Sequence, residues 1–198
     1  VWLDQRRSEN LPPMGGIWDP LIRLSGRGAT LDYFRSEAEC NWLARQQPEI
    51  WNRTHKYLLL SGYHSYRLTG RFVDAVAAQV GYLPFDYKAQ TWAKPGHWKW
   101  QAVPIRPEWL PDLVPPGQTL GTISAAAADA TGIPAGLPLI AAAGDKACEV
   151  LGSGSLEPHV GSISLGTTAT INTTHRRYTE VIRIVPPLCC MTPSVGYV

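Results

Sequence analysis

One carboxylate, Asp145, stands between an apolar run and a short small-residue segment in AAAGDKACEVLGSG, residues 141–154. The run GLPLIAAAG before it predicts a buried strand, because it is short, apolar and bounded by Gly and Pro. The segment KACEVLG after it predicts a short helix that ends at Gly152. Asp145 would then lie just beyond the carboxyl end of a strand, where open α/β sheets bind their ligands. Helix capping is the alternative interpretation, since Asp is a favoured N-cap residue.

Trp2, Asp4 and Arg6 alternate in the segment VWLDQR. On a strand these three side chains share one face, because side chains alternate with a period of two. An aromatic ring beside a carboxylate and a guanidinium suits a polyol, since the ring packs on C–H faces while the charged groups bind hydroxyls. A structural salt bridge at a strand end would explain the same residues.

A third candidate site is the segment SLGTTAT, residues 164–170. Gly166 would let the backbone approach a ligand closely, and Thr167 and Thr168 offer hydroxyl and N–H groups to phosphate oxygens. The alternative is an ordinary β-turn, because Gly marks turns of every kind.

The elements that would position these residues begin with an irregular, Gly- and Pro-rich segment over residues 5–35. A helix is expected next, with Ser36 and Glu39 forming a capping box and Pro48 interrupting the helical pattern. Residues 71–118 hold many of the Pro and Trp residues, and they predict surface segments and short helices.

The other segments alternate between strand and helix, which predicts an α/β architecture. The segment KYLLLSGYHSYRLTG predicts a short strand and then a helix from Ser61 to Gly70. The remaining expected elements are a helix that ends at Gly132, a strand over 137–143, two short strands separated by Gly166, and a loop over 186–198. The apolar face of the last two strands would need further strands to cover it.

Composition indicates a globular protein, since 44% of the 198 residues are hydrophobic and 17% are charged. The formal net charge of +2 is too small to imply nucleic acid or an anionic membrane as a partner. The eight Trp residues must be mostly packed or must line pockets.

The four cysteines, Cys40, Cys148, Cys189 and Cys190, lack the paired spacing of a zinc site, and we expect no metal bound by the protein. We therefore expect a reducing, cytoplasmic location. No apolar run approaches the roughly 20 residues of a membrane helix, and no signal peptide is visible. The chain begins without Met, as if it were cut from a longer protein.

In their order and spacing, these pieces resemble the FGGY family of carbohydrate kinases, which includes glycerol kinase, xylulokinase and fuculokinase. The matching pieces cover most of residues 1–174. They are VWLDQRRS, NWLARQQPEIWNRTHKYLLLSGYHSYRLTG, EWLPDLVPPGQTLGTISAAAADATGIPAGLPLIAAAGDKACEVLGSG and VGSISLGTTAT.

The resemblance implies two actin-like, RNase H-like domains around a cleft that holds the sugar and Mg-ATP. Residues 1–157 would form most of the N-terminal, sugar-binding domain, and 158–198 would begin the C-terminal, nucleotide-binding domain. The expected ligands are ATP, Mg²⁺ and a sugar or polyol. A homodimer is also expected to be common in such kinases.

The resemblance also assigns roles to residues. Asp145 falls on the catalytic Asp, the general base for the sugar hydroxyl that attacks the γ-phosphate. Trp2 and Asp4 fall on the sugar side of the cleft, with Arg6 as a weaker addition. Gly166 and Thr167 fall on the turn that faces the ATP phosphates, and Thr168 follows. A helix N-terminus favours an anion, so base and cap are compatible roles for Asp145.

Three departures from the family pattern are visible. The Asp-x-Gly-Thr phosphate loop that begins the family pattern and the Gly-rich adenine segment that ends it are missing, so the 198-residue chain alone is expected to be inactive. Lys146 replaces a Gln, Asn or Thr; it could bind an acidic group on the substrate or point to solvent. Glu39 stands where relatives often carry Lys.

Two other function classes remain open at this stage. One is a non-catalytic, truncated actin-like module that binds a sugar or a partner subunit. The other is a purely structural α/β domain, in which Trp2, Asp4 and Asp145 would share no cleft.

Overall fold

The computed structural model describes residues 6–166, 169–179, 191–192 and 196–197. The helices are α1 Trp18–Leu24, α2 Gly28–Glu37, α3 Glu39–Gln46, α4 Pro48–Asn52, α5 Leu60–Thr69, η1 Val76–Ala78, α6 Trp98–Ala102, η2 Pro107–Trp109, α7 Ala125–Thr131 and α8 Asp145–Gly152. The strands are β1 Val73–Ala75, β2 Phe85–Asp86, β3 Thr91–Trp92, β4 Asp112–Val114, β5 Thr119–Thr122, β6 Pro138–Ile140, β7 Gly161–Leu165, β8 Ala169–Thr173, β9 Met191–Thr192 and β10 Gly196–Tyr197.

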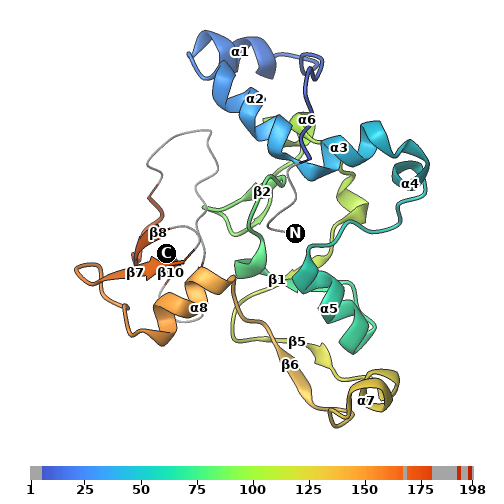
Figure 1. The fold of residues 1–198 in the computed structure, drawn as a ribbon, viewed down its shortest axis with the longest axis vertical. Coiled ribbons are helices and arrows are strands. Elements are labelled where there is room, and N and C mark those ends of the chain that lie inside the picture. The colour runs from blue at the N-terminus through green and yellow to red at the C-terminus, as the bar shows by residue number, and fades with distance from the viewer. Residues whose placement is uncertain (1–5, 167–168, 180–190, 193–195, 198) are drawn as a thin grey trace.

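Helices α1 and α2 lie at one end of the longest axis, and α7 with β5 and β6 lies at the other (Figure 1). Strands β1 and β4 pair in parallel, and the four other pairs are antiparallel: β2 with β3, β5 with β6, β7 with β8, and β9 with β10. Helix α8 and the β7–β8 hairpin project to one side of the middle (Figure 1). Within the described residues, no helix combines the length and apolar character needed to cross a membrane.

The main core is aromatic and draws heavily on residues 71–118, so the prediction that this segment lies on the surface is wrong. The Phe34 ring, 1% exposed, packs edge-on against Trp98 and Tyr82 at centroid distances of 5.1 and 5.4 Å. Phe85 is also buried there. Large aromatic side chains bury much apolar area, and this outweighs the local turn signals.

Residues 5–35 were expected to be irregular, and 6–17 form no helix or strand, but residues 18–24 form α1 and 28–35 form most of α2. In α1, Asp19 and Arg23 are an i, i+4 ion pair with a 2.7 Å separation. In α2, Leu31 and Phe34 lie three residues apart on one buried face. The helix forms because its apolar face packs on the core. The Gly and Pro residues of the segment had instead suggested irregular structure.

Ser36 does not cap a helix as the capping-box prediction required. It lies inside α2, and its hydroxyl donates to the Tyr33 carbonyl at 2.9 Å, while Ala38 is the N-cap of α3. The helix expected after it is present, and Pro48 begins the separate helix α4.

Two predicted helix ends are confirmed. Gly70 ends α5 and Gly132 ends α7 in the left-handed conformation, with φ of 74° and 75°. The strand predicted before α5 is absent, since the described residues 56–59 form no ladder and Tyr57 N–H donates singly to the Trp109 carbonyl at 2.9 Å.

The strand before Asp145 is shorter and more exposed than predicted. Strand β6 covers only Pro138–Ile140, and Ile140 is 48% exposed. It pairs with β5 alone among the described residues, so its other edge is unpaired there. The loop predicted over 186–198 is also wrong in part, because β9 and β10 lie there.

The β7–β8 hairpin is present as predicted, with Gly166 at its turn. Ile163 pairs with Ile171 across the hairpin, and these two side chains are 66% and 74% exposed. Leu165 lies on the same face and is 82% exposed. One face of the hairpin is therefore an open apolar surface.

Asp74 is a buried carboxylate in the middle of β1, with 1% of its surface exposed. Its Oδ2 accepts hydrogen bonds from the Ser61 hydroxyl and from Gln79 Nε2, both at 2.8 Å, and its Oδ1 accepts from Ala75 N–H at 2.8 Å. A Cβ at Gly62 would lie only 3.1 Å from Asp74 Oδ2, so glycine permits this approach. Asp74 thus fixes η1 to the start of α5.

Burial raises the pKa of the Asp74 carboxyl above its ordinary value of 3.8, although its hydrogen-bond donors oppose the shift. The folded state therefore holds this proton more tightly than the unfolded chain does. The stability contributed by this difference is complete below the ordinary pKa and is lost as the pH rises through the raised one.

We predict that Asp74→Asn lowers the free energy of unfolding by about 1–3 kcal/mol. The amide N–H₂ that replaces one carboxylate oxygen is itself a donor, so the groups that donate to that oxygen would lose their acceptor. The difference in the free energy of unfolding between the two proteins should be largest in acid and should decrease as the pH rises through the raised pKa of Asp74. Urea unfolding at a series of pH values measures both. A difference in the free energy of unfolding that widens with rising pH would show that the hydrogen-bond donors, and not burial, determine the direction of the pKa shift of Asp74.

Candidate active site

Asp145 is the first residue of α8, and its side chain is exposed. Gly144 is the N-cap, and Asp145 Oδ1 accepts a hydrogen bond from the adjacent Lys146 N–H at 2.8 Å. The prediction that Asp145 caps the helix is therefore wrong by one residue, since the cap position has extended backbone that Gly144 supplies. The carboxylate still lies in the first turn, where the helix dipole favours an anion.

The start of α8 is fixed on its inner side. Gly144 N–H donates to the Ala77 carbonyl of η1 at 3.0 Å, and Ala147 and Val150 are 0% exposed. Asp74 holds the same η1 turn. Two hydrogen bonds, Gln79 to Asp74 and Gly144 to Ala77, are joined through the backbone of η1, and they connect the buried carboxylate to the residue before Asp145.

Lys146 joins α8 to the β7–β8 hairpin. Its ammonium lies 2.9 Å from Glu149 Oε2 and donates to the Ser164 hydroxyl at 3.1 Å. The hydrogen bond and charge of Glu149 raise the pKa of Lys146, so the side chain remains a cation. The prediction that Lys146 points to solvent does not describe this arrangement. The other predicted role, binding an acidic group on the substrate, stays a prediction.

Gly166 lies two residues beyond Ser164, at the exposed turn of the hairpin. An added Cβ at Gly166 would meet no heavy atom of the described residues within 4 Å. The turn is therefore open to a ligand from that side. Thr167 and Thr168, the other predicted phosphate-binding residues, lie outside the described residues.

Arg6 lines a cavity of about 330 Å³ between the N-terminal segment, α2, α3 and the chain after η1. Its guanidinium carbon lies 4.4 Å from the centroid of the Trp42 ring, a cation–π contact. Glu39, the residue whose charge departs from the family pattern, lines the same cavity. Trp2 and Asp4, predicted to share a face with Arg6, lie outside the described residues.

Two tyrosines give the Arg6 cavity neutral hydroxyl groups. Burial raises the pKa of Tyr57 and of Tyr82, and for Tyr82 a hydrogen bond with Tyr33 contributes. Both hydroxyls therefore keep their protons across the physiological range. A cavity with a guanidinium, a carboxylate and phenolic hydroxyls has the mixture of donors and acceptors that a polyol requires.

The Arg6 cavity and Asp145 are joined through one segment of chain. Residues 80–83 form a wall of the cavity, and they follow directly on η1, whose Ala77 carbonyl holds Gly144. The structure thus brings Asp145, Lys146 and Gly166 onto α8 and the hairpin that α8 contacts, and it places Arg6 in a separate cavity whose wall follows η1.

Sequence reasoning missed Asp74 and the tyrosines of the Arg6 cavity. A signal for Asp74 was present, since it is a lone carboxylate in the otherwise apolar run FVDAVAA. No such signal marks Tyr57 or Tyr82, which reach the cavity only through the tertiary fold. Within the described residues, no group of three His, Cys, Asp or Glu side chains could hold a metal ion.

Comparison with known proteins gives a family match over residues 21–152, to the N-terminal domain of the FGGY family of carbohydrate kinases. The uncharacterized sugar kinase YgcE of Escherichia coli K12 is 42% identical over 107 residues, covering 54% of this chain and 22% of that protein. The L-fuculokinase of the same organism is 29% identical over 147 residues, covering 74% of this chain and 30% of that protein. The chain thus spans less than a third of the length of these relatives.

Two solved structures from Lactobacillus acidophilus share the fold. A gluconate kinase aligns with a TM-score of 0.71 at 18% identity, covering 90% of this chain and 37% of that one. A xylulose kinase aligns with a TM-score of 0.70 at 17% identity, covering 90% and 38%. The predicted α/β, actin-like fold is therefore confirmed. Because the family match covers more than half of the chain, the chain belongs to the FGGY family of carbohydrate kinases.

Proposed function

We propose that the intact protein transfers the γ-phosphate of ATP to a hydroxyl of a sugar or polyol, with Asp145 as the general base. The observation that carries this proposal is the position of Asp145, an exposed carboxylate at the start of α8. The helix is hydrogen-bonded to η1, which precedes the wall of the Arg6 cavity, and to the β7–β8 hairpin. Membership of the FGGY family and the sugar-kinase names of the relatives support it.

In the proposed step, the sugar hydroxyl oxygen forms a bond to the γ-phosphorus of ATP while the bond to the β–γ bridging oxygen breaks. ADP leaves with that oxygen, and the hydroxyl proton passes to the Asp145 carboxylate. Phosphoryl transfer needs mainly alignment and charge neutralisation, so one well-placed carboxylate is sufficient as a general base.

Gly166, Thr167 and Thr168 would bind the phosphates of ATP through backbone N–H groups and hydroxyls. Mg²⁺ would arrive bound to the phosphates of the nucleotide. Mg²⁺ commonly binds through one or two carboxylates together with phosphates and water, and the exposed Asp145 fits such a role in part.

Trp2 and Asp4 would bind the sugar together with Arg6, and Lys146 would contact the substrate by exchanging its bond to Glu149 for one to the ligand. We further propose that residues 1–157 belong to the sugar-binding domain and 158–198 to the nucleotide-binding domain. The family match, which ends at residue 152, supports this boundary. A cytoplasmic location and a homodimeric assembly complete the proposal.

We predict that Asp145→Asn in the intact protein lowers kcat by roughly 10²–10⁴-fold, the usual contribution of a general base. Sugar affinity should change little, because the amide keeps the size of the side chain. A coupled assay of ADP release over a panel of sugars measures kcat. Asp129→Asn, at an exposed Asp of α7, is the matched control and should retain full activity. Near-normal turnover in Asp145→Asn would contradict the assignment of the base.

We predict that Arg6→Met raises the KM for the sugar by about tenfold or more, as expected for a lost hydrogen bond from a charged donor. The KM for ATP should not change, because Arg6 lies in the cavity assigned to the sugar. Arg53→Met, at an exposed position just beyond α4, controls for the loss of a positive charge. A rise in the KM for ATP alone would place Arg6 on the nucleotide side instead.

A further inference from the structure

The β7–β8 hairpin has two chemically different faces. One is the open apolar surface described above. Side chains alternate along a strand, so Ser162 and Ser164 lie on the opposite face, and both are half-buried. Ser162 Oγ lies 3.5 Å from the hydroxyl of Ser153, the residue after α8, and Ser164 Oγ accepts a hydrogen bond from Lys146 within α8. The polar face of the hairpin is therefore the one turned toward α8.

The base of the hairpin is anchored more firmly than its turn. Thr174, directly after β8, is 1% exposed, and its hydroxyl donates to the Ser155 carbonyl at 2.7 Å. At the other end, Leu165 is 82% exposed, and a Cβ added at Gly166 would meet no heavy atom of the described residues within 4 Å. Packing therefore does little to hold the turn. Of the hydrogen bonds that join the described part of the hairpin to α8, the one at Ser164 lies nearest to it.

The Lys146 ammonium uses all three of its N–H donors in this region. Two go to Glu149, with distances of 3.1 Å to Oε1 and 2.9 Å to Oε2, and the third goes to the Ser164 hydroxyl at 3.1 Å. Glu149 lies three residues further along α8, where side chains of one helix face meet. With two donors held on its own helix, the ammonium directs the third across to the hairpin.

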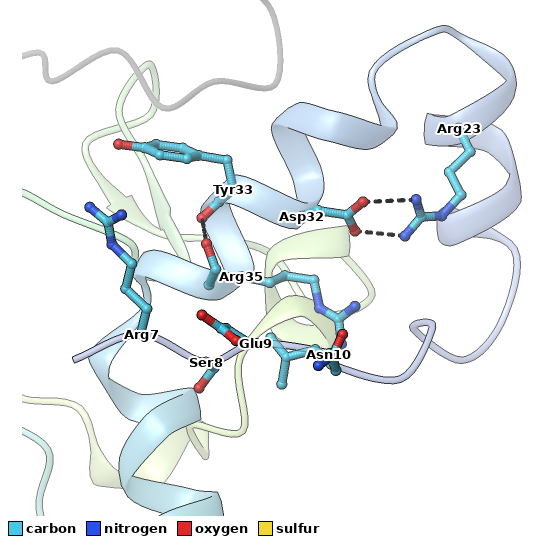
Figure 2. Close-up of a pocket in the computed structure, with 10 residues that line it drawn as sticks. Arg7, Ser8, Glu9, Asn10, Arg23, Asp32, Tyr33 and Arg35 are labelled. Carbon is cyan, nitrogen blue, oxygen red and sulfur yellow. Dashed lines mark hydrogen bonds and ion pairs between the residues drawn. The ribbon is translucent and has the colours of Figure 1, made fainter. Parts of the chain in front are cut away.

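A cation joins two elements in the same manner elsewhere in the chain. Arg23 of α1 pairs with Asp19 on its own helix and with Asp32 of α2, both at 2.7 Å. Figure 2 shows the pair between Arg23 and Asp32. The partner on the second element is a carboxylate there, whereas Lys146 meets a neutral hydroxyl on the hairpin. The Lys146–Ser164 hydrogen bond is therefore the weaker connection, and removal of one hydroxyl breaks it.

We propose that Ser164 is a positioning residue for the phosphates of ATP: through Lys146, it holds the turn at Gly166 in a fixed place relative to Asp145. This role rests on the proposed function, because it matters only if the turn binds phosphates. Lys146 follows Asp145 directly, and Ser164 lies two residues before Gly166, so one hydrogen bond connects the base to the turn. A turn that is held in place before ATP binds loses less conformational freedom on binding.

The test is steady-state kinetics of the intact protein with varied ATP and the sugar that gives the highest rate in the panel. Ser164→Ala should raise the KM for ATP on the order of tenfold, as for one lost hydrogen bond from a charged donor. The KM for the sugar should not change, because the Arg6 cavity is separate from the hairpin. Ser164→Thr keeps the hydroxyl and should restore the KM for ATP. Ser162→Ala, on the same face of β7, is the matched control and should leave this KM unchanged.

A loss of stability alone would not give this result, because a smaller folded fraction lowers kcat and leaves both KM values unchanged. Asp32→Asn supplies that comparison, since it weakens the ion pair between α1 and α2 far from the hairpin in the sequence. In a Lys146→Met background, Ser164→Ala should raise the KM for ATP no further, because the hydrogen bond is already absent. Independent effects of these two changes would overturn the role of Ser164.

The outcomes separate the role of Ser164 from the kinase function itself. Turnover that is lost in Asp145→Asn, together with an unchanged KM for ATP in Ser164→Ala, would overturn the positioning role and leave the kinase function standing. No phosphorylation of any sugar by the unsubstituted protein would contradict the kinase function, and the role of Ser164 would fail with it.

Discussion

The buried carboxylate of Asp74 is the constraint on which the arrangement of the candidate site depends. It accepts hydrogen bonds from Ser61 at the start of α5 and from Gln79 beyond η1, so it ties a helix and a turn to one point. The η1 turn in turn holds Gly144 through the Ala77 carbonyl. A carboxylate desolvated to this degree is tolerated only with several donors, and those donors give the connection its rigidity.

Few contacts connect the η1 turn to the elements that carry the candidate site. The inner face of α8 is buried, while its first turn faces outward with Asp145, and Lys146 reaches across to Ser164 of the hairpin. The wall of the Arg6 cavity continues from the same η1 turn. Such a layout suits chemistry in which a carboxylate, a polyol and a phosphate must be aligned and little else is required of the protein.

The sequence predicted the features that depend on local backbone chemistry. The left-handed glycines Gly70 and Gly132 and the break at Pro48 each follow from one residue's conformational preference, and the β7–β8 hairpin follows from its alternating β-branched residues. The family resemblance, which rests on ordered motifs, gave the fold. The failures lie where tertiary packing overrides local signals. Residues 71–118 are buried because aromatic rings cluster there, and the role of Asp74 depends on partners 13 residues before it and 5 after it.

The open apolar face of the β7–β8 hairpin has a consequence for the behaviour of the molecule in solution. Ile163, Leu165 and Ile171 form a row of branched side chains on a two-stranded ribbon, which is the pattern that promotes self-association of strands. Because facing residues alternate with a period of two, a shift of register by one residue would turn this row to the opposite face. We therefore expect the 198-residue chain to self-associate at high concentration unless another surface packs on these three side chains. Charged residues at the three positions would be the simplest way to prevent this association.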